Sequence, residues 1–202
     1  MSKINEQEEA GIITRALVDF FSMVPTSSLQ KSDFPERDSE KIVSKASWKA
    51  ALISGSLALP PGPWGMATIL PDLIAIWKVQ AQMVADIAAI YGKTATLTPE
   101  AMLYCCFKHG ASHVFRDVVV RMGERILVKR TTLKIIQEIC AKIGIKITQR
   151  LLGKTISRWV PIFGALAVGA YAKYDTNEVG KTASDFFKLD IEIEGDNESK
   201  AA

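Results

Sequence analysis

The chain has 202 residues, of which 48% are hydrophobic and 23% charged, with a formal net charge of +3. This is enough apolar material for one domain with a real core, and the length makes two domains unexpected. Glu6, Glu8 and Glu9 precede the first run of apolar residues, the reverse of the basic start of a secretory signal, and three cysteines suit a reducing cytosol better than a disulfide framework. We therefore expect a cytoplasmic protein with one domain over residues 1–187 and an acidic, disordered tail over 188–202.

Apolar residues recur at helical spacing, and this predicts an all-α bundle of six to seven helices. We expect helices over residues 5–23, 36–59, 71–91, 98–129, 132–152, 155–173 and 177–187. Thr98-Pro99-Glu100 is a typical helix start, with a threonine cap, a proline in the first turn and an acid near the positive helix end. Gly92 is expected to end the third helix in the left-handed conformation.

A run of 22 uncharged residues lies between Lys49 and Asp72. Its length approaches that of a membrane-spanning helix, but the prolines and glycines of residues 60–65 interrupt helical register at its centre. We expect an apolar hairpin that is buried in protein or dips into a membrane surface, together with a second apolar segment over 159–172. The residues predicted to bind ligand or membrane are Pro61, Gly62, Pro63, Trp64, Gly65, Met66, Asp72, Trp159 and Phe163.

Asp72 is the only charged residue between Lys49 and Lys78. A carboxylate among apolar residues could bind a cation, relay a proton or anchor a polar headgroup. The alternative is that Pro71 occupies the first helical position, so that free N–H groups and the helix dipole stabilise Asp72 without any catalysis. We favour this second interpretation.

The weak metal candidate consists of Cys106, His109 and His113. Two histidines four residues apart on one helix face can hold zinc if a third ligand arrives from elsewhere. No acid lies between the histidines to serve as a metalloprotease base. Ordinary interior cysteines and partly exposed histidines are therefore the favoured interpretation, and we expect neither a metal nor another cofactor.

Basic residues concentrate in the middle of the chain, where residues 93–158 carry 13 Lys and Arg against four acids. Arg121, Arg125 and Lys129 would step by four along one helix, and with Arg130 they are predicted to attract anionic headgroups, at about 1 kcal/mol each. A solvated helix face is the alternative. Interleaved aromatic residues and recognition motifs are lacking, so no specific nucleic acid partner is expected.

Two segments resemble the EcsC family of bacterial proteins. The first contains Leu59-Pro-Pro-Gly-Pro-Trp-Gly, Ile69-Leu-Pro-Asp-Leu, Gln80 and Ile90-Tyr-Gly-Lys, and the second contains Val160-Pro-Ile-Phe-Gly-Ala and Tyr174-Asp-Thr-Asn-Glu-Val-Gly-Lys-Thr-Ala. The resemblance covers residues 41–187. It implies a helical, cytosol-facing protein, sometimes encoded beside an ABC transporter, with no established enzymatic reaction.

We therefore expect a non-enzymatic, cytosol-facing protein that associates peripherally with the inner membrane or binds an apolar or lipid ligand. The alternative is an interaction module that docks on a membrane transporter or assembles into a homo-oligomer. A third interpretation is an enzyme or metal protein that uses Asp72 or the pair His109 and His113.

Overall fold

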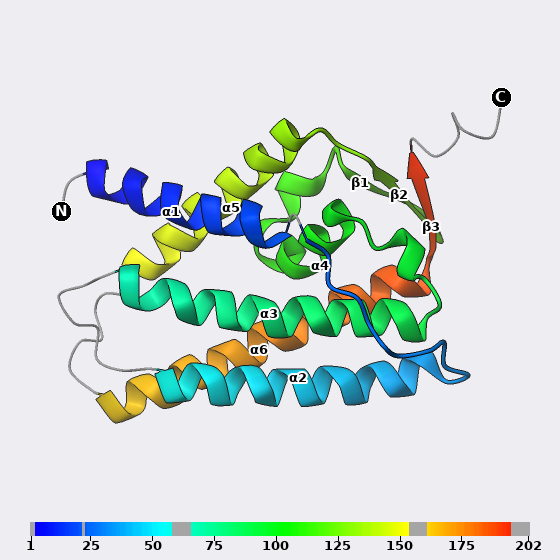
Figure 1. Ribbon diagram of the computed structural model, residues 1–202, viewed down its shortest axis with the longest axis horizontal. Coiled ribbons are helices and arrows are strands. Elements are labelled where there is room, and N and C mark those ends of the chain that lie inside the picture. Colours follow the sequence, from blue (N-terminus) through cyan, green and yellow to red (C-terminus); the bar gives the residue numbers. More distant parts are fainter. Residues whose placement is uncertain (1–2, 22, 58–65, 154–160, 195–202) are drawn as a thin grey trace.

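The computed structural model describes residues 3–21, 23–57, 66–153 and 161–194 and is predominantly helical (Figure 1). This confirms the expected helical bundle, to which a small sheet is added. The elements in chain order are α1 (Lys3–Phe21), α2 (Pro35–Leu57), α3 (Met66–Ile90), the 3₁₀ helix η1 (Thr94–Thr96), α4 (Pro99–Ala111), the 3₁₀ helix η2 (Ser112–Phe115), β1 (Val119–Met122), β2 (Arg125–Lys129), α5 (Leu133–Gly153), α6 (Pro161–Lys188) and β3 (Asp190–Glu194).

Three long helices form one side of the molecule. Helices α2, α3 and α6 run alongside one another, whereas α1 packs on α5 above them (Figure 1). Helix α4 lies between these groups and contacts α1, α3, α5, α6 and the strands β1 and β2. This central position makes α4 the element through which the two helical groups and the sheet share one core.

Two helix ends form as the sequence predicts. The side chain of Thr98 accepts a hydrogen bond from the first turn of α4 and caps it. Gly92 has a φ of 69°, which favours glycine, and follows the end of α3. The N–H groups of Gly92 and Lys93 donate to the carbonyls of Ala89 and Ala88, both at 2.8 Å, in the pattern of a Schellman motif.

The predicted helix over residues 98–129 is wrong beyond Ala111. Residues 119–129 instead form the antiparallel hairpin of β1 and β2, joined by a two-residue loop. Gly123 takes the first loop position with a φ of 64°, as tight hairpin turns require. The run of valines over residues 118–120 favours a strand because branched side chains pack well on a pleated surface.

The expected disordered tail is also wrong for Asp190–Glu194, which form the parallel strand β3 beside β2. Ile191 lies opposite Ile126 in this register, and Ile191 packs on the main core. The alternating sequence of β3 thereby gives this strand one apolar side and one acidic side, and the acidic side lies opposite Arg125 and Lys129 of β2.

From Pro161 onward, the helices predicted over 155–173 and 177–187 form one continuous helix, α6, and residues 155–160 lie outside the described part of the chain. The polar residues Asp175 and Thr176 suggested a break between two helices. In the fold, Thr176 is fully buried, and both side chains hydrogen-bond to Gln80 of α3. These polar groups join α6 to its neighbour, so they do not end the helix.

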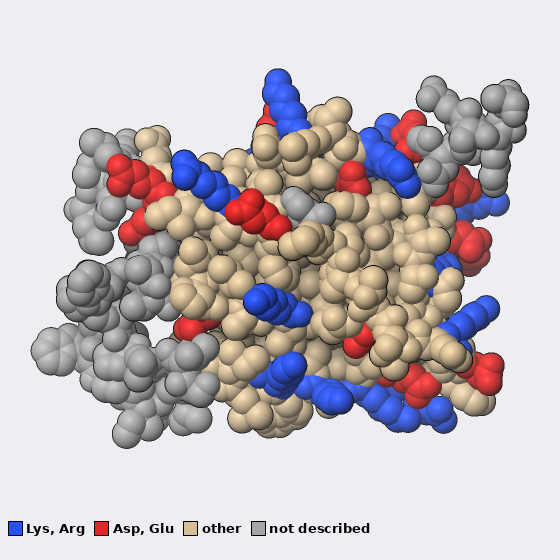
Figure 2. Space-filling model, in the orientation of Figure 1, with Lys and Arg blue, Asp and Glu red and all other residues tan. Residues whose placement is uncertain are grey.

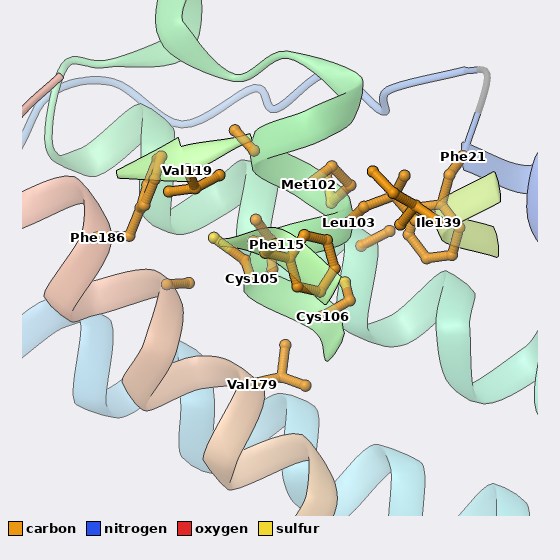
Figure 3. Packing of buried hydrophobic residues seen from close by; sticks show 14 of the residues in the cluster. Phe21, Met102, Leu103, Cys105, Cys106, Phe115, Val119, Ile139, Val179 and Phe186 are labelled. Atoms are coloured by element: carbon orange, nitrogen blue, oxygen red, sulfur yellow. The ribbon is translucent and has the colours of Figure 1, made fainter. Parts of the chain in front are cut away.

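The main core gathers buried apolar side chains from α1, α3, α4, α5, α6 and the sheet, part of which Figure 3 shows, and partly buried residues of α2 pack against it. Phe115 and Phe186 are each 1% exposed within it. Cys105, Cys106 and Cys140 are buried and free, so the prediction of interior cysteines without disulfides is confirmed.

One stretch of the described chain, Leu70–Ile90 within α3, is long and apolar enough to cross a membrane, with a mean hydropathy of 1.4. Of the most apolar part of that stretch, 61% is buried inside the protein. The central helix of a helical core has the same properties, and α3 contacts α2, α4 and α6.

Candidate functional site

A cavity of about 130 Å³, partly open to solvent, lies where α3, α4, α5 and α6 meet. Most of its wall is apolar, and three side chains that can carry charge interrupt it. The lining residues are Leu73 and Trp77 of α3, Cys106, Phe107, His109, Gly110 and Ala111 of α4, Ile143, Lys146 and Ile147 of α5, and Tyr171 and Asp175 of α6.

Aromatic rings hold the apolar part of the cavity in shape. Trp77 and Phe107 meet edge to face, with ring centroids 6.2 Å apart. Phe21 of α1 packs behind both rings, at 5.4 Å from Phe107 and 6.3 Å from Trp77. Such edge contacts restrain both rings, so the cavity wall is largely preformed.

Asp175 organises the polar part of the cavity. Its Oδ1 lies 2.8 Å from Nε2 of His109, and its Oδ2 accepts a hydrogen bond of 2.8 Å from Nε2 of Gln80. An ionised carboxylate only accepts, so this contact fits the His109 tautomer that carries a proton on Nε2. Gln80 is 1% exposed and also donates to Thr176 at 3.3 Å. Side chains from α3, α4 and α6 therefore hold one another in place.

Lys146 brings a positive charge to the α5 side of the cavity. Its Nζ donates to the carbonyl oxygen of Gly110 at 3.3 Å and lies 3.4 Å from Nδ1 of His113. Both contacts are longer than a good N–H···O bond of about 2.9 Å, and neither partner carries a negative charge. Within the described part of the chain, no ion pair involves this ammonium group.

The pair formed by His109 and Asp175 resembles the imidazole and carboxylate of general acid–base sites. However, no described Ser, Thr or Cys side chain is hydrogen-bonded to His109. The nearby thiol of Cys106 is unsuited to attack, since burial raises its pKa well above the usual value and the neighbouring Cys105 and Asp175 act in the same direction. The arrangement is better suited to holding a ligand than to nucleophilic chemistry.

Thiol labelling tests this view of the cysteines. Burial raises the pKa of Cys140 to about 12 and also raises the pKa of Cys105 and Cys106. We expect no labelling by a disulfide reagent in the folded protein at about pH 8, and labelling of all three thiols after unfolding in guanidinium chloride. One thiol that reacts in the folded protein as fast as a free cysteine would contradict this and support an activated Cys106.

The predicted metal candidate does not assemble. Helix α4 ends at Ala111, so His109 and His113 do not share one helix face. His109 is directed to Asp175, and His113 lies beside Lys146. No three His, Cys, Asp or Glu side chains in the described ranges gather in a way that could hold a metal ion.

Asp72 lies deeper in its helix than predicted. Helix α3 includes residues 66–70, so Pro71 is inside the helix and Asp72 belongs to its second turn. Burial raises the pKa of the Asp72 carboxyl, the opposite of what stabilisation by a helix N-terminus would do. The first-turn interpretation is therefore wrong, and Asp72 lies next to the cavity residue Leu73 without lining the cavity itself.

The predicted row of cations lies on the hairpin and its exit and not along a helix. Arg125 pairs with Glu192 at 3.0 Å, and Lys129 pairs with Glu194 at 3.5 Å. The guanidinium of Arg121 donates to the carbonyl oxygen of Gly123, and Arg130 follows β2. Acidic and basic side chains are mixed at this end of the molecule (Figure 2). Strand β3 thus offsets part of the predicted basic surface.

The predicted apolar hairpin lies mostly outside the described residues. This applies to Pro61, Gly62, Pro63, Trp64 and Gly65, and to Trp159 of the second apolar segment. Met66 begins α3 and Phe163 belongs to α6, and the structure does not describe their side chains.

Sequence reasoning missed most of the cavity, including Trp77, Lys146 and Asp175. Two signals were present. Gln80 is an amide in the middle of the apolar helix α3, where a polar group needs a partner, and Asp175 interrupts an otherwise helical pattern. Both residues also belong to the segments that carry the EcsC resemblance, and they are hydrogen-bonded to each other.

No family model, no curated protein and no solved structure matches this chain. The resemblance to the EcsC family therefore stays a prediction.

Proposed function

We propose that the protein binds a small apolar ligand, without catalysis, in the cavity between α3, α4, α5 and α6. The observation that carries this proposal is a largely apolar wall built by four helices, with a few fixed polar groups in it. Binding sites for small molecules combine these two properties, because apolar area supplies affinity and the polar groups set orientation.

The size of the cavity limits the ligand. A volume of about 130 Å³ is close to that of engineered apolar cavities of about 150 Å³ that bind benzene. One aromatic ring or a short branched chain fits this space. Because the cavity is partly open, the bound group is either a whole small molecule or one end of a larger one, such as a lipid.

Ligand binding is favoured over attachment to a membrane surface. Two of the four cations predicted to meet anionic headgroups form ion pairs with β3, which weakens the electrostatic attraction. The cytosolic location, peripheral association with the inner membrane, docking on a transporter and self-assembly stay predictions, as does membership of the EcsC family.

Titration with benzyl alcohol, a neutral ring of suitable size, tests the proposal. The chain contains two histidines, one in the cavity wall and one beside Lys146. Side-chain NMR signals of ¹⁵N-labelled histidine therefore come from two rings only, and a His113→Gln variant assigns the signals to one ring or the other. We expect saturable shifts of the His109 signal.

A cavity-filling variant makes the test specific. Ile147→Phe adds a ring to the cavity wall, whereas the control Ile145→Phe alters an exposed side chain on the same helix. Burying a ring is worth about 1.5–3 kcal/mol, so Ile147→Phe should weaken binding by about tenfold or more and Ile145→Phe should not. Absence of saturable binding to the unaltered protein, or equal binding by the two variants, would refute the proposal.

A further inference from the structure

We infer that the cavity selects ligands in which a small apolar body carries an anionic group such as a carboxylate, and that Lys146 binds that group. This inference rests on the proposed function and adds the charge of the ligand to it. It depends on a contrast between Lys146 and Asp175, which line the cavity with opposite charges.

Lys146 has unused capacity to bind an anion. An ammonium group has three N–H donors, and among the described residues its two partners are the carbonyl of Gly110 and the Nδ1 atom of His113. Both contacts are long and neither partner carries a negative charge. A carboxylate would add an ion pair with a short hydrogen bond to this ammonium group, in place of two long contacts to partners without negative charge.

The surroundings of Lys146 strengthen such a bond. Its side chain is half-buried, and two residues of the same helix line the cavity with it: Ile143, one turn earlier, and Ile147, the next residue. Apolar neighbours lower the effective dielectric constant, so opposite charges attract more strongly there than in bulk water. The same isoleucines would contact the apolar body of the ligand.

Asp175 is a poorer site for a cationic ligand. Both of its carboxylate oxygens already accept hydrogen bonds at 2.8 Å, from His109 and from Gln80. Two hydrogen-bond partners within the protein therefore already contact the Asp175 carboxylate, whereas the Lys146 ammonium contacts no negatively charged group among the described residues. The preferred ligand carries its anionic group on the α5 side, away from Asp175.

Three probes with the same ring test the inference: benzoate, benzyl alcohol and benzylammonium. A partly exposed ion pair adds up to about 1 kcal/mol, so we expect benzoate to bind roughly fivefold more tightly than benzyl alcohol. Benzylammonium should bind most weakly, and added salt should reduce the preference for benzoate. The histidine NMR signals and calorimetry measure all three affinities.

Matched variants assign the preference to Lys146. Lys146→Met keeps most of the apolar stem and should abolish the preference for benzoate over benzyl alcohol, and Lys146→Arg should keep that preference. The control Lys142→Met removes an exposed cation one turn earlier on α5 and should behave like the unaltered protein. Unchanged benzoate preference in Lys146→Met, or an equal loss in Lys142→Met, would overturn the inference.

The outcomes separate this inference from the proposed function. Saturable binding of benzyl alcohol without a preference for benzoate overturns the inference and leaves the proposed function standing. Tighter binding of benzylammonium does the same and assigns selectivity to Asp175. Failure of all three probes to bind overturns both.

Discussion

Replacing Phe21 with alanine is expected to lower the free energy of unfolding by about 3–5 kcal/mol, the cost typical of removing a buried phenyl ring. Phe21 is 1% exposed and joins α1 to the rest of the core. Its ring contacts Phe20 at 4.8 Å between centroids, Phe107 at 5.4 Å and Trp77 at 6.3 Å. The substitution removes both the buried area and these edge contacts, and it leaves a void beside the rings that line the cavity.

Urea unfolding followed by circular dichroism measures this effect. Phe34→Ala is the matched control, since the Phe34 ring is 61% exposed and its described partner is the guanidinium of Arg37, 4.8 Å away. An exposed cation–π contact of this kind is worth about 0.5–1 kcal/mol. Equal losses in the two variants would show that the ring of Phe21 is not a core contact between α1, α3 and α4.

Local signals in the sequence predicted most helices and their ends. Thr98 caps α4 and Gly92 ends α3 as the sequence predicts, because a helix cap and a left-handed residue depend on the nearest few residues only. The hairpin was missed because Arg121, Arg125 and Lys129 were interpreted at helical spacing. The valines before Gly123 and the two-residue loop were the stronger signal.

The cavity could not be predicted from local sequence signals, because the residues that meet in it are far apart in the chain. Gln80 and Asp175 are 95 residues apart in sequence, and His109 and Asp175 are 66 apart. A helical period shows that each residue is on a helix, but it does not show which helices meet or at what height. Strand β3 illustrates the same limit, since an acidic segment becomes ordered only through its pairing with β2.

Gly180→Ala is expected to destabilise the protein by about 1–2 kcal/mol, although alanine is the better helix former. A Cβ atom at Gly180 would overlap the Val43 side chain of α2, with Cγ1 at 2.7 Å and Cβ at 3.1 Å. Because valine is branched at Cβ, its side chain has little freedom to turn away, and α2 must shift from α6. Overpacking of this kind costs about 1–3 kcal/mol, which exceeds the 0.5–1 kcal/mol gained from helix propensity.

Two further variants decide whether this close approach of α2 and α6 is the cause. Gly11 also lies in a helix, and no atom lies within 4 Å of a Cβ placed there, so Gly11→Ala should stabilise the protein by about 0.5–1 kcal/mol. Val43→Ala should relieve the overlap, so that the double variant with Gly180→Ala is more stable than the sum of the single effects predicts. Additive effects in this double-mutant cycle, measured by urea unfolding, would mean that the two helices do not meet at Gly180 and Val43.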